Sequence, residues 1–212
     1  MASRGVFITF EGMDGSGKST QLQRLAVRLH GMGRAVLKTV EPGGTAIGRK
    51  IRQILLDAAN RELRPTAELL LYFASRAQNV EEMILPALAR GEIVLADRFT
   101  DSTLVYQGCA RGLGPDVVRA LDRIACHGLR PDLTLLLDIG PETSLARAHA
   151  RNLAETSAET RMDEQSAEFH RKVYEAYQAL AASEPERVRR IPAAGSIEEV
   201  ERAVWEAVQG YV

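Results

Sequence analysis

The stretch Gly12-Met13-Asp14-Gly15-Ser16-Gly17-Lys18-Ser19 fits the pattern G-x-x-x-x-G-K-[ST], which is typical of loops that bind nucleotide phosphates. An apolar run, residues 6–10, comes directly before it, and residues 18–30 after it repeat apolar side chains at helical spacing. Strand, glycine-rich loop and helix in this order are the context that such a loop requires. The sequence therefore predicts a phosphate-binding site rather than a simple glycine-rich turn.

The chemistry of phosphate binding explains the residue types in this loop. Glycines let backbone N–H groups approach phosphate oxygens without a Cβ clash, and the following helix adds the positive end of its dipole. Lys18 can reach the β- and γ-phosphates, and the Ser19 hydroxyl can bind Mg²⁺. We therefore expect ATP with Mg²⁺. The residues expected to contact its phosphates are Gly12, Met13, Asp14, Gly15, Ser16, Gly17, Lys18, Ser19 and Thr20.

Outside the loop, short apolar runs alternate with longer amphipathic stretches. The runs are residues 6–10, 35–40, 92–96, 133–138 and 187–191, and the helical patterns cover residues 18–30, 46–57, 66–90, 115–127, 141–151, 166–182 and 196–208. Such alternation predicts βα units, which build a parallel sheet with helices on both faces. We expect one α/β domain over residues 1–212 around five parallel strands, because no linker or repeat divides the chain.

Composition and charge exclude several other classes of protein. Lys and Arg total 27 against 28 Asp and Glu, so the net charge of −1 predicts neither nucleic acid nor a membrane as a partner. No apolar run reaches the roughly 18 residues of a membrane span, and the N-terminus lacks a secretion signal. Cys109 and Cys126 match no metal-binding spacing, so we expect two reduced thiols. These features predict a cytoplasmic protein.

The segment Arg151–Asp163 (RNLAETSAETRMD) differs from the rest of the chain in being polar and rich in small residues. It has almost no large apolar side chains, so we expect it to contribute little to a core. It is either an ordinary surface loop or a lid that closes over bound nucleotide.

The residues that follow the run 92–96 indicate which kind of molecule accepts the phosphoryl group. The base-reading motif N-K-x-D of GTPases does not occur, whereas Asp97 follows four apolar residues, as in ATPases that activate water. Asp97 can hold or orient Mg²⁺ and its waters, and Arg98 can donate two N–H groups to a phosphate. Since the carboxyl ends of parallel strands form the ligand-binding edge, both are candidate site residues, and a structural Asp–Arg pair is the alternative.

Tyr72 and Arg76 lie four residues apart in the predicted helix 66–90 and therefore share a face. A ring and a guanidinium on one face suit a planar base, which can stack on the first and hydrogen-bond the second. An aromatic side chain on a helix can equally belong to the core. Arg52 can add charge near an acceptor phosphate or lie solvated at the surface.

Together these motifs resemble the thymidylate kinase family in order and spacing. The matching segments are Phe10–Thr20 (FEGMDGSGKST), Glu41–Thr45 (EPGGT), Tyr72–Arg76 (YFASR), Asp97–Phe99 (DRF), Ser102–Gly108 (STLVYQG) and Arg161–Asp163 (RMD). The resemblance implies the P-loop nucleoside monophosphate kinase fold, a mobile lid at about residues 147–163 and a homodimer. It also implies transfer of the γ-phosphate of ATP to dTMP, giving dTDP and ADP, in dTTP biosynthesis. The alternatives are a kinase for another nucleoside monophosphate or small acceptor, and a P-loop ATPase.

The same resemblance implies a role for each site residue. Tyr72 would stack on thymine and Arg76 would hydrogen-bond the base, while Arg52 and Arg98 would grip the dTMP phosphate. Asp14 would face the sugar 3′-hydroxyl or metal-bound water. The base and sugar pocket would be lined by Ser102, Thr103, Tyr106 and Gln107. The expected catalytic residues are Lys18, Asp14, Asp97, Arg98 and Arg151, with Ser19 and Asp97 at the Mg²⁺, directly or through water.

The phosphate loop itself carries no arginine, although charge on the transferring phosphoryl group needs a cation beyond Lys18 and Mg²⁺. Arg147, Arg151 and Arg161 could supply it from the lid and contact ATP, which is similar to the lid-arginine type of thymidylate kinase. Arg151 is our first choice. The chain departs from the family in Tyr72, where Phe is commoner, and in Val40, where many bacterial members carry arginine.

Overall fold

The chain folds around one sheet of five parallel strands. The computed structural model describes residues 4–155 and 159–212. The strands are β1 (Phe7–Glu11), β2 (Val36–Val40), β3 (Ile93–Asp97), β4 (Leu133–Asp138) and β5 (Val188–Pro192). They lie in the order β2-β3-β1-β4-β5, and each pair of neighbours is parallel. The predicted α/β class and five-stranded parallel sheet are confirmed.

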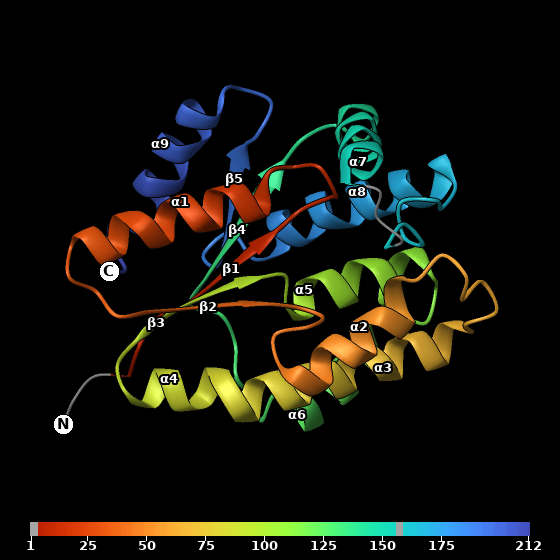
Figure 1. The fold of residues 1–212 in the computed structure, drawn as a ribbon, viewed down its shortest axis with the longest axis horizontal. Helices are drawn as coiled ribbons and strands as arrows, with labels where there is room; N and C mark the ends of the chain where they lie inside the picture. The colour runs from red at the N-terminus through yellow and green to blue at the C-terminus, as the bar shows by residue number, and fades with distance from the viewer. Residues whose placement is uncertain (1–3, 156–158) are drawn as a thin grey trace.

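Helices cover both faces of this sheet (Figure 1). They are α1 (Lys18–Gly31), α2 (Ala46–Leu56), α3 (Pro65–Asn79), η1 (Val80–Ile84), α4 (Leu85–Ala89), α5 (Thr100–Thr103), η2 (Leu104–Ala110), α6 (Pro115–Ala125), α7 (Pro141–Glu155), α8 (Ala167–Ser183) and α9 (Ile197–Val208). None of those described is long and apolar enough to cross a membrane.

Alternate side chains of each strand point to opposite faces, and each face has its own core. Ile8 and Phe10 of β1 pack with apolar residues of α1 and α9. Phe7, the residue before Ile8, packs on the other face with α3, η1, α4 and α6. A third cluster joins α8 to η2 and to Leu136 of β4. The sheet is thereby held between layers of packed helices.

The predicted helix 66–90 is interrupted, which is a correction to the sequence analysis. α3 ends at Asn79, and the π-helical residues of η1 separate it from α4. Pro86 supplies the physical reason, because it has no N–H to donate to the preceding turn and its ring crowds a carbonyl there. The helical path continues, but with a wider turn before the proline.

The helical segment from α5 through η2 was not expected from the sequence. Thr100, Thr103, Val105 and Gly108 have low helix propensity. Packing overrides this preference, since Val105 and Tyr106 are buried against α8. The residues of the motif Ser102–Gly108 therefore project from a helix rather than from a loop.

The described parts of the segment 151–163 differ from an ordinary polar loop. α7 ends at Glu155 rather than at Arg151, and residues 156–158 lie outside the described part of the chain. Met162 is buried and belongs to the cluster that includes Tyr106 and Phe169. The expectation that the segment adds little to a core is therefore wrong for its last residues.

Candidate nucleotide-binding site

A cavity of about 580 Å³ lies at the carboxyl ends of β1, β2 and β3. Most of the predicted site residues line it: Asp14, Gly15, Gly17, Lys18, Ser19, Thr20, Arg52, Tyr72, Arg76, Asp97, Arg98, Ser102, Thr103, Tyr106, Gln107, Arg147 and Arg151. They come from six separate segments of the sequence. The fold thus brings the predicted ATP and acceptor residues into one space.

The phosphate loop joins β1 to α1 in a conformation that glycine makes possible. Gly12 and Gly15 have positive φ angles of 132° and 78°. A Cβ on Gly12 would lie 2.6 Å from the carbonyl oxygen of Leu137, and one on Gly15 would lie 2.5 Å from that of Ser144. Ser144 also donates a short hydrogen bond to the carbonyl of Asp14. The loop is therefore packed directly against α7, which leads into the segment proposed as a lid.

Lys18 is buried at the start of α1 and held by the loop itself. Its Nζ donates to the carbonyl oxygens of Gly12 at 3.1 Å and Met13 at 2.8 Å. Burial lowers the pKa of Lys18 to about 8, and the nearby Arg98 cation acts in the same direction. An anionic phosphate beside Nζ would raise this pKa again, so the ammonium form is favoured when nucleotide binds.

Ser19 and Asp97 meet at the place where a metal would lie beside the phosphates. The Ser19 hydroxyl donates to Oδ2 of Asp97 at 2.5 Å. Hydroxyl and carboxylate oxygens are hard donors that suit Mg²⁺, which takes few ligands from protein and the rest from phosphate and water. Among the described residues there is no cluster of three or more acidic, His or Cys side chains that could form a closed metal cage. The pair fits an Mg²⁺ that arrives with a nucleotide.

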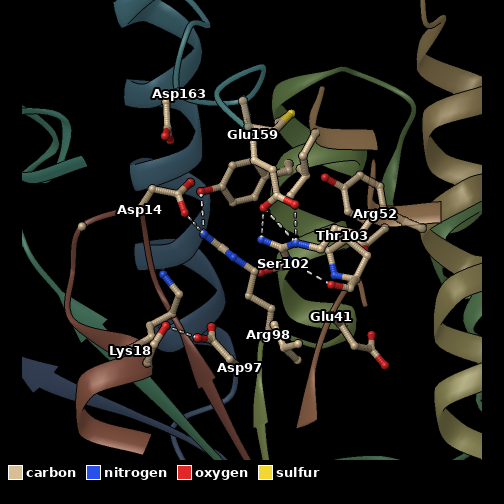
Figure 2. Close-up of a pocket in the computed structure, with 18 of the residues that line it drawn as sticks. Asp14, Lys18, Glu41, Arg52, Asp97, Arg98, Ser102, Thr103, Glu159 and Asp163 are labelled. Carbon is tan, nitrogen blue, oxygen red and sulfur yellow. Dashed lines mark hydrogen bonds and ion pairs between the residues drawn. The ribbon is translucent and has the colours of Figure 1, made fainter. Parts of the chain in front are cut away.

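Arg98 and Asp14 form an ion pair in the middle of the cavity (Figure 2). Arg98 Nη2 donates to Asp14 Oδ1 at 2.8 Å, and Nη1 donates to Ser102 Oγ at 2.8 Å. Burial alone would raise the pKa of Asp14, but the charges of Arg98 and Lys18 outweigh it and hold that pKa well below its usual value. Arg98 has φ 71°, a conformation that favours glycine. The position is therefore strained for its side chain, as is common at functional sites.

Glu11 and Tyr177 support Arg98, and the sequence analysis missed both. Glu11 is fully buried and accepts hydrogen bonds from Phe99 N at 2.8 Å, Ser102 Oγ at 2.6 Å and Tyr177 Oη at 2.9 Å. Tyr177 Oη in turn lies 3.3 Å from Arg98 Nη1. Glu11 could have been predicted as a site residue, because it is a charged residue at the end of an apolar strand. Tyr177 had none, because α8 reaches the site only through the tertiary fold.

The side chain of Arg76 is buried in the wall of the cavity. Its Nε forms a short contact with Glu41, and Nη2 donates to Phe99 O at 3.1 Å and to Thr103 Oγ1 at 2.9 Å. Nη1 is buried and has no hydrogen-bond partner among the described residues. Tyr72 lies one turn earlier on α3, and burial raises the pKa of its phenol to about 12. The Tyr72 and Arg76 side chains thus line the same cavity.

Arg52 reaches the cavity from α2 and forms an ion pair with Glu159. Its Nη2 donates to Glu159 Oε2 at 2.7 Å, and its Nη1 donates to Pro42 O at 3.0 Å. Figure 2 shows the pair beside Arg98. Arg52 is therefore available to an anion that displaces Glu159.

Two of the three predicted lid arginines line the cavity from α7. Arg147 Nη1 donates to the carbonyl oxygen of Ala193 at 3.2 Å. Arg151 is held more loosely, since Nη2 lies 3.4 Å from Asp163 Oδ2 and its side chain is 43% exposed. Its other contacts are with Asn152, the adjacent residue.

Arg161 and three residues of the phosphate loop were predicted as site residues but do not line the cavity. Arg161 is buried, with Nη1 2.7 Å from Glu68 Oε2 and Nε bonded to Leu55 O. It is not among the residues that line the cavity, and neither are Gly12, Met13 and Ser16. Sequence spacing could not predict this result, because the buried partner that holds Arg161 is Glu68, a residue far away in the chain.

Comparison with known proteins agrees with the geometry of this site. The family described as thymidylate kinase matches residues 10–204 of the chain. A thymidylate kinase of Pelobacter propionicus is 50% identical over 201 residues, covering 94% of this chain and 92% of that protein. One from Solidesulfovibrio magneticus is 48% identical over 205 residues, covering 96% and 98%. The crystal structure of thymidylate kinase from Ehrlichia chaffeensis matches with a TM-score of 0.79 and 29% identity, covering 97% of this chain and 99% of that one.

Proposed function

The chain belongs to the thymidylate kinase family, and we propose that its cavity holds ATP and dTMP end to end. The reaction is transfer of the γ-phosphate of ATP to dTMP, giving dTDP and ADP. The fold is that of P-loop nucleoside monophosphate kinases. The alternatives of another nucleotide kinase and of a P-loop ATPase are less well supported than this assignment.

One observation carries the proposed arrangement: the cavity has a second set of cations beyond the phosphate loop. Lys18, Arg98 and Arg52 follow one another across the pocket in Figure 2. An enzyme that passes phosphate to water has no need of a second phosphate clamp. A phosphate acceptor bound at Arg98 and Arg52 would face a γ-phosphate held at Lys18, which is the placement that direct transfer needs.

The base would lie at the closed end of the cavity. Tyr72 offers a ring for stacking. Arg76 also lines the cavity, and its guanidinium keeps one buried donor, Nη1, without a partner among the described residues. Tyr106 has its hydroxyl 3.5 Å from Arg98 Nη2, where it would lie close to the sugar of the acceptor. Asp14 is ionised beside Arg98 and would accept from the sugar 3′-hydroxyl. Ser102, Thr103 and Gln107 complete this pocket.

Magnesium with ATP is part of the proposal. Ser19 and Asp97 would hold the ion, directly or through water. When bound, Mg²⁺ supplies positive charge beside the phosphate oxygens. The residues of the chain do the rest: the phosphate loop orients ATP, Arg98 and Arg52 orient the acceptor, and Arg151 comes from α7 to the transferring group. We place the lid at about residues 147–163 of a single domain, and the enzyme in the cytoplasm.

An acceptor panel tests the assignment of the cavity. ADP release is measured with ATP and Mg²⁺ in the presence of dTMP, dUMP, dCMP, dGMP or shikimate. We expect dTMP to give the highest kcat/KM, and EDTA to abolish turnover with every acceptor. A rate with dTMP no greater than the rate without acceptor would remove the proposal.

We also propose that the enzyme is a homodimer formed through α2, α3 and α6. α3 packs against both α2 and α6. The three helices carry exposed large apolar side chains: Ile47, Ile54, Leu70, Val117 and Ile124. Ile124 is 73% exposed. A group of exposed apolar residues on neighbouring helices is typical of an interface with another protein, and a second copy can bury it in a symmetric contact.

Light scattering after gel filtration is expected to give twice the mass of the chain. Ile124→Glu should convert the protein to monomers, because it puts a charge into the buried centre of the contact. Val27→Glu is the matched control, since Val27 is also exposed but lies on α1. A monomeric unaltered protein would contradict the proposal.

A further inference from the structure

Glu68 is a buried carboxylate behind the base end of the cavity, with no role in the proposed reaction so far. It lies on α3 one turn before Tyr72 and is 1% exposed. Its Oε1 accepts a hydrogen bond from Gln107 Nε2 at 2.9 Å. Arg161 Nη1 lies 2.7 Å from Oε2, and the guanidinium of Arg111 lies 3.3 Å from both oxygens.

This environment keeps Glu68 ionised. Burial alone would raise the pKa of its carboxyl group. The hydrogen bond from Gln107 and the charges of Arg111 and Arg161 outweigh burial and hold the pKa of Glu68 below its usual value. An ionised carboxylate only accepts hydrogen bonds.

The ionised state of Glu68 decides which way the carboxamide of Gln107 faces. The NH₂ group must point to Glu68, because the reversed amide would place its oxygen against a carboxylate. The remaining polar atom, Oε1, has no hydrogen-bond partner among the described residues. Gln107 lines the cavity next to Thr103 and Tyr106. The chain therefore presents an acceptor to a ligand at this point.

We infer that Glu68 is a positioning residue that sets base specificity by fixing Gln107 as a hydrogen-bond acceptor. Thymine and uracil carry an N–H donor at ring position N3, whereas N3 of neutral cytosine is itself an acceptor. Two acceptors facing one another in a buried site leave both without a partner, which is costly. Glu68 thus excludes cytosine without touching the base. This inference rests on the proposed placement of the base beside Gln107.

The test compares dUMP with dCMP, because both lack the 5-methyl group and differ at N3 and position 4. Glu68→Gln keeps the shape of the side chain but offers a donor as well as an acceptor, so the amide of Gln107 can turn either way. We expect the ratio of kcat/KM for dUMP to that for dCMP to fall by about tenfold, the size of one neutral hydrogen bond. Glu164→Gln is the matched control: it removes an acidic partner of an arginine nearby but contacts no residue of the base pocket, and the ratio should not change.

A second variant separates positioning from general damage to the fold. Gln107→Leu removes the amide but leaves Glu68 paired with Arg161, and it should lower the same ratio by a similar factor. In the Gln107→Leu background, Glu68→Gln should then change the ratio no further. The inference is overturned by an unchanged ratio in Gln107→Leu, by an unchanged ratio in folded Glu68→Gln, or by an equal effect of Glu68→Gln in both backgrounds. Absence of dTMP phosphorylation by the unaltered protein would instead overturn the proposed function.

Discussion

Replacing Arg151 by alanine is expected to lower kcat for dTMP phosphorylation by about a thousandfold. The transferring phosphoryl group develops charge on its outer oxygens, and removal of a cation that stabilises it typically costs three or more orders of magnitude. The phosphate loop contains no arginine in residues 14–17. The cation must therefore come from another part of the cavity, and α7 is the element packed against the loop at Gly15.

The contacts of the three predicted lid arginines point to Arg151. Arg161 is bound to Glu68 within the protein, and Arg147 is tied to the carbonyl of Ala193. Among the residues that the structure describes, Arg151 has only a 3.4 Å ion pair with Asp163 and contacts with Asn152, its neighbour. It is thus the cation that can turn toward ATP at the lowest cost.

Arg147→Ala is the control for this prediction, since Arg147 lies one turn earlier on the same helix and also lines the cavity. Steady-state kinetics should show a loss in kcat of tenfold or less for Arg147→Ala, and little change in the KM for ATP for either variant. Arg151→Lys should recover part of the rate, because it restores charge without the planar fork. If Arg147→Ala loses more kcat than Arg151→Ala, the role belongs to Arg147.

The parts of the site that the sequence could predict are those built from local patterns. The loop Gly12–Ser19 can be predicted from a strand, a glycine pattern and a helix that follow one another in the sequence. Asp97 can be predicted from its position at the end of an apolar strand. Both lie at the carboxyl edge of the sheet, as expected. The prediction of one continuous helix over 66–90 is wrong, because Pro86 disturbs the turn before it and the chain there is π-helical.

The residues that sequence reasoning missed act through contacts between distant segments. Tyr177 bonds to Glu11 across 166 positions of the chain, and Arg161 reaches Leu55 across 106. No periodicity or spacing encodes such pairs. The same holds for Glu68, which is buried on α3 and accepts a hydrogen bond from Gln107 of η2, 39 positions away.

Four cations of the cavity share one property that the sequence could not reveal: each already has a hydrogen-bond or ion-pair partner within the protein. The pairs are Lys18 with the loop carbonyls, Arg98 with Asp14, Arg52 with Glu159 and Arg151 with Asp163. A phosphate that binds here must compete with these partners. Two of the pairs join the segment after residue 158 to the rest of the site. We therefore expect the binding of anions to change the position of that segment.

Replacing Arg98 by alanine is expected to lower kcat/KM for dTMP by about 100- to 1000-fold, through a higher KM and a lower kcat. Loss of a buried cation that binds a phosphate costs this much because the remaining anions have no partner. Asp14 would lose the charge that holds its pKa low, and its carboxylate would repel the acceptor phosphate. The KM for ATP should change little, since Lys18 and the backbone of the loop remain.

A second variant distinguishes loss of the clamp from damage to the turn. Arg98 has φ 71°, which glycine adopts freely and alanine does not. Arg98→Gly should therefore have a Tm at or above that of Arg98→Ala, yet show the same loss in kcat/KM for dTMP. Arg98→Lys should recover little, because an ammonium cannot reproduce the two-pronged donation to Asp14 and Ser102. If Arg98→Gly restored activity along with stability, or if ATP binding fell as far as dTMP binding, Arg98 would be a structural residue of the turn and the acceptor phosphate would have to lie elsewhere.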